Sequence, residues 1–210
     1  MAKQIEGVYE RILESAKAEF LENGYVDASL RTIAANADTS TNSIYVRFKD
    51  KEGLFSAIVE PVMNGLLDMF RNVQEIFHHF DDETQRDQMG QYSSGEILKM
   101  MDYMYDHLNE FHLLLDASHG TRFQNFLDEF VRIETEYTYK WMEATGCRIE
   151  VEGDITENLL HIVNTSYFEG VFEVIRHDMS REEAKKYITV LGKYHHEGFR
   201  AIIRPAGGND

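Results

Sequence analysis

Apolar residues recur at helical spacing along most of the chain, with short polar breaks between the segments. The first segment, over 5–22, has an apolar stripe with a four-residue repeat, formed by Val8, Ile12, Ala16 and Phe20. Asn23-Gly24 follows it and is typical of a helix end, because glycine readily takes the left-handed conformation. The pattern therefore predicts an N-terminal amphipathic helix that ends near Gly24.

Two short helices are predicted next. Ser29 is suited to cap the first of them, which buries Leu30, Ile33, Ala34 and Ala37. A break at Asp38-Thr39 separates it from a helix over about Ser40 to Val46, which buries Ile44. Asp50 then caps a longer fourth helix. Pro61 lies inside that helix and predicts a kink or break there, because proline lacks the backbone donor.

The remaining pattern predicts more helices and no strand. Residues 81–91 are polar and acidic without an apolar period, so we expect a loop there. Ser93 with Glu96 resembles a capping box that opens the next helix, and Ser180 with Glu183 resembles another. Further helices are expected over about 122–144, 154–178 and 181–203. The fold class is therefore all-α, with about nine helices in total.

Composition limits the classes of protein to which the chain can belong. It has 210 residues and one cysteine, Cys147, which excludes an internal disulfide framework. No secretory signal pattern and no run of about 18 apolar residues is present, so we expect a cytoplasmic protein without a membrane partner. The formal net charge of −16 argues against nucleic-acid binding. However, residues 1–58 hold seven basic and nine acidic residues, against 14 and 28 in the remainder, so the acidity lies mostly in the C-terminal part.

The two short helices and their turn describe a helix-turn-helix unit packed on a preceding helix. The residues from Ser29 to Ala37, SLRTIAANA, are followed by DTSTNSIY up to Tyr45 and by VRFKDKEGLF up to Phe55. Over about residues 8–60 this closely resembles the DNA-binding domain of the TetR family of bacterial regulators. The resemblance implies a helix-turn-helix DNA-binding domain over 1–60 and a helical ligand-binding and dimerisation domain over 61–210. It also implies a ligand-responsive regulator, by default a repressor, that binds a palindromic operator as a homodimer.

The family's motif can be carried over residue by residue. The resemblance implies that the helix from Ser40 enters the major groove, with Thr41, Asn42 and Ser43 as readers of base edges and Tyr45 and Lys51 on the DNA backbone. Backbone contacts are also expected from Arg31, Thr32 and Arg47. Asp38 stands where the family usually has glycine, and Thr41-Asn42 stand where it often has lysine-glycine. These departures predict an operator unlike that of a relative. Taken alone, Tyr45 would more often be a half-buried packing residue than a DNA contact, and Lys51 would be a solvated surface charge.

The C-terminal part offers two sets of candidates. A cavity for a largely apolar or aromatic, not strongly anionic small molecule could be lined by Met63, Leu67, Met101, Tyr105, Phe130, Tyr137, Asn164, Tyr167 and Phe168. A dimer interface made by the last two helices could contain Ile155, Leu159, Ile162, Val163, Val171, Ile175, Ile188, Leu191, Gly198 and Ile202. For both sets the alternative is an ordinary intramolecular core.

Other functional classes have less support. The nine histidines form no recognised metal motif, and no nucleophile elbow, phosphate loop or zinc signature occurs, so we expect no enzyme, cofactor or metal. A helical interaction module without specific DNA binding remains the alternative, because the first domain is slightly acidic and its recognition helix lacks a lysine near its start. A helical metal-dependent enzyme is the least supported hypothesis.

Overall fold

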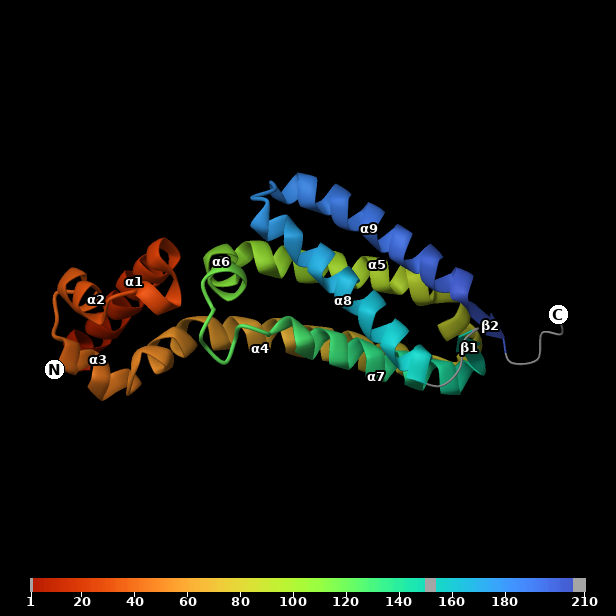
Figure 1. Cartoon of the computed structure of the whole chain (residues 1–210), viewed down its shortest axis with the longest axis horizontal. Coiled ribbons are helices and arrows are strands. Elements are labelled where there is room, and N and C mark those ends of the chain that lie inside the picture. The colour runs from red at the N-terminus through yellow and green to blue at the C-terminus, as the bar shows by residue number, and fades with distance from the viewer. Residues whose placement is uncertain (1, 150–153, 206–210) are drawn as a thin grey trace. The chain divides into compact units, whose positions relative to one another are not determined.

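The computed structural model describes residues 2–149 and 154–205, which form helices α1 to α9 and two short strands (Figure 1). The all-α class expected from the hydrophobic pattern is confirmed. The chain divides into two compact units. Unit 1 comprises Met1–Gly65 and His107–Asn125, and unit 2 comprises Leu66–Asp106 and Phe126–Asp210.

Unit 1 contains the predicted helix-turn-helix. Its helices are α1 (Ala2–Asp27), α2 (Leu30–Asn36), α3 (Thr41–Phe48), the first part of α4 (Lys51–His78) and α6 (Leu108–Asp116). α1 is interrupted at Gly24, whose φ of 70° is left-handed, at the predicted helix end.

The helix starts in unit 1 lie where the capping residues predicted them. The Ser29 hydroxyl accepts a hydrogen bond from the Thr32 amide at the start of α2, and Asp50 Oδ1 accepts one from the Gly53 amide at the start of α4. Asp38 has a φ of 50°, so aspartate does adopt the left-handed turn conformation between α2 and α3. These local hydrogen bonds and the turn at Asp38 determine where each of these helices begins.

A tightly packed core holds the three N-terminal helices together. Its fully buried members include Ile12, Phe20, Ile33, Ile44 and Phe55. The rings of Phe20 and Phe55 meet edge to face, with centroids 5.1 Å apart. The apolar positions predicted from the helical spacing therefore form the core on which α3 rests.

Residues 107–125 pack in unit 1, although the sequence analysis assigned them to the second domain. The Tyr25 amide donates to the Ala117 carbonyl at 3.0 Å, and Lys17 Nζ lies 2.7 Å from Glu110 Oε1. The Arg122 guanidinium also lies 2.8 Å from a carboxylate oxygen of Glu60 on α4. Contacts between residues so distant in the chain give no periodic signal, so the hydrophobic pattern did not predict them.

Unit 2 combines long helices with a small sheet. Its elements are the second part of α4, α5 (Asp82–Asp106), α7 (Leu127–Thr145), β1 (Cys147–Ile149), α8 (Asp154–Arg176), α9 (Arg181–Ile202) and β2 (Ile203–Pro205). The strands pair antiparallel, with Arg148 opposite Arg204. The expectation of no strand was wrong, because three-residue strands are too short to produce a period in the sequence. α5 packs on α9 and α7 packs on α8, as Figure 1 shows.

The loop expected over 81–91 is instead the first part of α5. Asp81 caps it, with Oδ1 accepting from the Thr84 amide and Oδ2 from the Thr84 hydroxyl. Gln85 is buried and donates to the Phe80 carbonyl at 2.8 Å, and Arg86 donates to the Thr145 carbonyl at 3.0 Å. Polar tertiary contacts, which hydrophobic periodicity does not record, thus stabilise this turn of helix. The predicted capping box at residues 93–96 is also wrong, since it lies within α5.

α4 continues through Pro61, so the helix does not break there, while the alternative of a kink stays a prediction. Among the described helices, α4 is the one whose length and mean hydropathy would allow it to cross a membrane. Its Leu54, Phe55, Val59 and Leu66 are fully buried in the protein, as in the core helix of a globular fold. Burial in a protein core accounts for the apolar composition of α4.

Candidate functional site

The two helical faces of α3 have different roles. Ile44 and Phe48, four residues apart, are buried and fasten the helix to unit 1. On the opposite side Asn42 is exposed, and Tyr45 and Val46 keep 51% and 73% of their surface accessible. An exposed valine beside an exposed tyrosine on a short rigid helix offers apolar surface to a partner.

Sequence reasoning missed Val46 as a candidate contact. The sequence pattern predicts Val46 as the last residue of its helix, whereas α3 extends to Phe48. The signal that could have found it is its position, because Val46 lies outside the i, i+4 pair of Ile44 and Phe48 and so cannot share their buried face.

Ser43 and Arg47 are joined within α3. Arg47 Nη1 donates to the Ser43 hydroxyl at 2.6 Å and to the Ser43 carbonyl at 3.1 Å. The hydroxyl oxygen of Ser43 is thus occupied as an acceptor, while its own hydrogen remains a donor. The predicted base reader and the predicted backbone anchor therefore form one side-chain pair in the protein without DNA.

Lys51 is also engaged within unit 1. Its Nζ donates to the Val26 carbonyl at 2.9 Å and lies 5.1 Å from the centroid of the Tyr25 ring. Burial lowers the pKa of Lys51, against the opposing influence of nearby Asp27 and Glu19. To reach a phosphate, Lys51 would exchange the carbonyl for a phosphate oxygen.

The other predicted DNA contacts lie at the surface of α2 and at the start of α3. Arg31 and Thr32 are exposed on α2. Ser40 is exposed and caps α3 by accepting from the Ser43 amide at 3.2 Å, and Thr41 is partly buried beside it. The structure thus brings the predicted residues together at α2, α3 and the first residue of α4.

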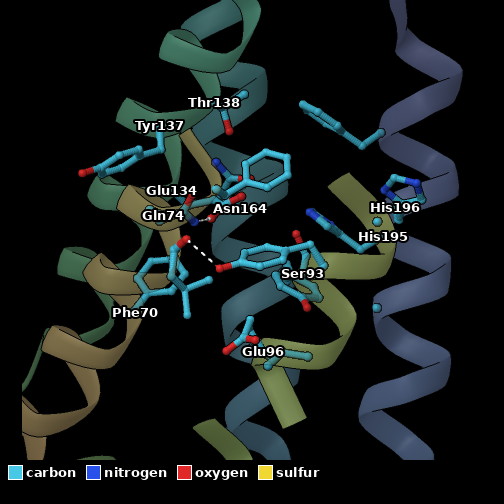
Figure 2. Close-up of a pocket in the computed structure, with 18 of the residues that line it drawn as sticks. Phe70, Gln74, Ser93, Glu96, Glu134, Tyr137, Thr138, Asn164, His195 and His196 are labelled. Atoms are coloured by element: carbon cyan, nitrogen blue, oxygen red, sulfur yellow. Dashed lines mark hydrogen bonds between the residues drawn. The ribbon is translucent and has the colours of Figure 1, made fainter. Parts of the chain in front are cut away.

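A pocket of about 100 Å³ lies within unit 2. Residues from α4, α5, α7, α8 and α9 line it, and Figure 2 shows the side chains that converge on it. Eight of the lining residues are phenylalanine, tyrosine or tryptophan, and they include Trp141, the only tryptophan of the chain. A mostly apolar cavity with a few convergent polar groups is the usual form of a small-molecule site.

The carboxyl group of Glu134 is the most unusual polar group in this pocket. Glu134 Oε2 accepts from Gln74 Nε2 at 2.7 Å (Figure 2). By exposed surface Glu134 is partly buried, it lines the cavity, and the surrounding protein replaces much of the water around its carboxyl group. This burial raises the pKa of Glu134 to about 7, and the hydrogen bond from Gln74 opposes the shift.

A stacked pair of rings forms another part of the wall. Tyr167 and His195 lie 4.1 Å apart between ring centroids, at an angle of 19°. Burial lowers the pKa of His195 to about 4, with His196 acting in the same direction, so His195 is neutral at pH 7. Burial also raises the pKa of Tyr167, and the charge of Glu134 adds to this rise.

Part of the predicted ligand set lines this pocket. Tyr137, Asn164, Tyr167 and Phe168 do so. The members that lie outside its lining are Met63, Leu67, Met101, Tyr105 and Phe130. Met63 belongs to unit 1, Leu67, Met101 and Phe130 are buried packing residues, and the Tyr105 hydroxyl donates to the Met179 carbonyl at 2.7 Å. The other lining residues were not predicted, and they include Phe70, Gln74, Trp141, both glutamates and three histidines. An aromatic stripe in a sequence does not indicate which of its members face a cavity.

The predicted dimer residues divide in a similar way. Val171, Ile175 and Ile188 are buried within unit 2, so they pack inside the chain rather than on its surface. Leu159, Val163, Leu191 and Ile202 are partly buried, while Gly198 is exposed and the side chain of Ile155 lies outside the described residues.

The same two helices carry exposed apolar side chains. Ile162 on α8 keeps 61% of its surface accessible, and Val190 and Tyr194 on α9 keep 69% and 78%. Sequence reasoning missed Val190 and Tyr194, although their i, i+4 spacing on an amphipathic helix could have suggested a second apolar face.

Within the described ranges, no three His, Cys, Asp or Glu side chains are grouped to hold a metal ion.

Residues 12–58 match the family described as "Bacterial regulatory proteins, tetR family". Over 71 residues, or 34% of the chain, the sequence is 35% identical to the uncharacterized HTH-type transcriptional regulator YvdT of Bacillus subtilis. It is also 35% identical over 71 residues to the HTH-type transcriptional regulator UidR of Escherichia coli. The matches span 37% and 36% of those two proteins, about a third of their length.

Solved structures resemble almost the whole chain. SmeT, the repressor of the Stenotrophomonas maltophilia multidrug efflux pump SmeDEF, matches with a TM-score of 0.63 at 18% identity, over 93% of this chain and 90% of that one. Its complex with triclosan matches with a TM-score of 0.64 at 19% identity, over 91% and 90% of the chains. At such low identity, these matches show that the fold is shared beyond residue 58 and do not by themselves show a shared function.

Proposed function

Because residues 12–58 make this chain a member of the tetR family of bacterial regulatory proteins, we propose that it is a ligand-responsive transcriptional regulator. It acts as a repressor and binds a palindromic operator as a homodimer. The observation that carries the proposal is the exposed face of α3, where Asn42, Tyr45 and Val46 project from a helix fastened by buried Ile44 and Phe48.

The face of α3 divides its contacts between bases and backbone. Thr41, Asn42 and Ser43, at the start of the helix, read base edges in the major groove, since this end of a recognition helix enters the groove. Val46 adds apolar contact with a thymine methyl group. Arg31, Thr32 and Arg47 contact the backbone, which sets the register of the protein on DNA without reading sequence.

Lys51 and Tyr45 are the anchors nearest to α3. Lys51 leaves the Val26 carbonyl for a phosphate oxygen, an exchange favoured because a charged hydrogen bond to an anion is stronger than one to a neutral carbonyl. Tyr45, half exposed, is free to place its hydroxyl on the backbone. These contacts offset the slightly acidic charge of residues 1–58.

A homodimer is supported by the surface of unit 2. Ile162, Val190 and Tyr194 expose apolar side chains on α8 and α9 that a second copy of these helices would cover. Two such copies would place their recognition helices in major-groove segments roughly 34 Å apart or somewhat more. This symmetry is the reason to expect a palindromic operator.

A small molecule in the pocket of unit 2 regulates the dimer. The pocket's aromatic lining favours an apolar or aromatic ligand, and the related fold of SmeT is known in complex with triclosan. The ligand favours a conformer whose recognition helices are wrongly spaced. Its effect on DNA affinity must equal the effect of DNA on ligand affinity.

A gel-shift titration with the DNA upstream of the chain's own gene tests the proposal. Lys51→Ala should weaken binding to every sequence alike, because a phosphate contact carries no sequence information. Asn42→Ala should instead change the preferred sequence. If both variants bind as the wild type does, α3 is not the recognition helix. If the wild type binds no DNA, the chain is an interaction module rather than a regulator.

A further inference from the structure

The pocket of unit 2 has an uncompensated acidic character. Its charged or titratable lining includes Glu96, Glu134 and the histidines His78, His195 and His196, and the lining residues that the structure describes include no lysine or arginine. Glu96 is neutralised by Lys99, whose Nζ lies 2.6 Å from Glu96 Oε1. Within the described part of the chain, Glu134 has no such cation and accepts only from the neutral amide of Gln74.

A buried carboxyl group without a cation is costly to ionise, because protein surrounds it in place of water. The rise in the pKa of Glu134 is the direct result. The ring of His195, which lines the same pocket, carries no charge at pH 7, since burial keeps it neutral. A positively charged ligand would therefore stabilise the ionised form of the Glu134 carboxyl group.

The walls around Glu134 also suit a cation. Phe70, Tyr137, Tyr167 and Phe168 line the same cavity, and aromatic faces attract cations within about 6 Å of the ring centroid. Figure 2 shows Glu134 beside Gln74 and Asn164, with Phe70 below them. The cavity of about 100 Å³ is about two-thirds the size of the roughly 150 Å³ cavity that holds benzene, so a guest with one aromatic ring requires a small outward movement of the wall side chains.

We propose that this pocket binds a small organic cation, a protonated amine on an apolar or aromatic body, with the Glu134 carboxylate as its counter-ion. The aromatic side chains hold the body of the ligand, and the ammonium group donates to the Glu134 oxygens. The proposal rests on the proposed function in one respect, since this cation is then the regulatory ligand.

Titration of the full chain with three probes of similar size tests this. Benzylamine is cationic at neutral pH, benzyl alcohol is neutral and benzoate is anionic. Binding is followed by the fluorescence of Trp141, which lies in the pocket wall, and by calorimetry. Because a hydrogen bond to a charged group contributes about 1.5–3 kcal/mol, benzylamine should bind about ten- to a hundredfold more tightly than benzyl alcohol. Benzoate should bind least.

Variants of α7 identify the counter-ion. Glu134→Gln should remove the preference for benzylamine while leaving the affinity for benzyl alcohol nearly unchanged. Glu134→Asp, which keeps the charge, should keep the preference. Glu136→Gln is the matched control, because Glu136 lies two residues away on α7, is exposed and pairs with Lys140 at 2.7 Å. It should bind all three probes as the wild type does.

Several results would overturn the cation site. They are equal binding of benzylamine and benzyl alcohol, preference for benzoate, no binding of any probe, or an unchanged preference in a folded Glu134→Gln variant. Gel shifts on the same samples without a probe separate this proposal from the previous one. If the chain binds DNA but not the amine, the proposed regulator stands and the proposed cation site is refuted. If it binds the amine but not DNA, the cation site stands and the proposed regulator is refuted.

Discussion

The buried carboxyl group of Glu134 makes stability depend on pH in a direction that can be measured. Below about pH 4.5, the ordinary pKa of glutamate, the group is protonated in both the folded and the unfolded chain. As the pH rises towards 7, the unfolded chain loses this proton while the folded chain keeps it. The unfolded state then binds fewer protons, so the free energy of unfolding falls, and the loss is constant above about pH 7.

The size of this effect follows from the two pKa values. One pKa unit corresponds to about 1.4 kcal/mol, so a rise from 4.5 to about 7 costs on the order of 3 kcal/mol at pH 8. Glu134→Gln removes the ionisable group but keeps the size of the side chain and a partner for Gln74. The variant should therefore gain on the order of 2–3 kcal/mol over the wild type between pH 5 and pH 8.

Urea unfolding at the two pH values, followed by Trp141 fluorescence, measures this difference, because Trp141 lies in the same unit as Glu134. Comparing variant with wild type cancels the titration of all other groups. Glu136→Gln is the matched control, since the hydrogen bond from Lys140 lowers the pKa of Glu136 below its ordinary value of 4.5. Glu136 is then ionised in both states at pH 5 and at pH 8, so its variant should differ from the wild type by about the same amount at the two pH values. If the stability difference between Glu134→Gln and wild type is the same at pH 5 and pH 8, Glu134 is not buried as the structure describes.

Two further predictions concern the helices of unit 2. A Cβ at Gly90 on α5 would meet the His196 ring, so Gly90→Ala should lower the melting temperature. A Cβ at Gly95 on the same helix would meet nothing, so Gly95→Ala should stabilise the protein by about 0.5–1 kcal/mol. Equal melting temperatures of the two variants would contradict the close packing at Gly90. Val190→Glu should shift the protein from dimer to monomer in light scattering, because it places a charge on the exposed apolar surface of α9. Lys185→Glu, on another face of α9, should leave the dimer intact. If the Val190→Glu variant remains a dimer, the exposed surface of α9 is not the interface.

Local chemistry made the helix-turn-helix predictable from the sequence. The capping roles of Ser29 and Asp50 and the left-handed turn at Asp38 depend on residues within three positions of one another, which the sequence displays directly. The buried face of α3 could also be predicted from the sequence, because Ile44 and Phe48 are apolar and lie four residues apart. Exposed Val46 was missed because the helix was predicted to end there, two residues short of its end.

Long-range contacts explain what the sequence analysis missed. The first turns of α5 depend on Gln85. Its side-chain amide donates to the Phe80 carbonyl, and its backbone carbonyl accepts from Trp141 Nε1, 56 residues away. The packing of residues 107–125 in unit 1 depends on pairs such as Lys17 and Glu110. Few residues of the pocket wall were predicted for the same reason, since Tyr137, Asn164, Tyr167 and Phe168 are the candidates that line it. The convergence of Gln74 and Glu134 requires two helices to be placed side by side.

The measurement that tests the central claim most directly is selection of the DNA bound by the full chain from a random pool. A homodimer that reads bases with Asn42 and its neighbours on α3 predicts enrichment of a two-fold symmetric sequence, with half-sites one or more helical turns apart. Asn42→Ala should enrich a different half-site with the same spacing. Failure to enrich any sequence, or enrichment that is identical for wild type and Asn42→Ala, would contradict the assignment of α3 as the sequence-reading helix.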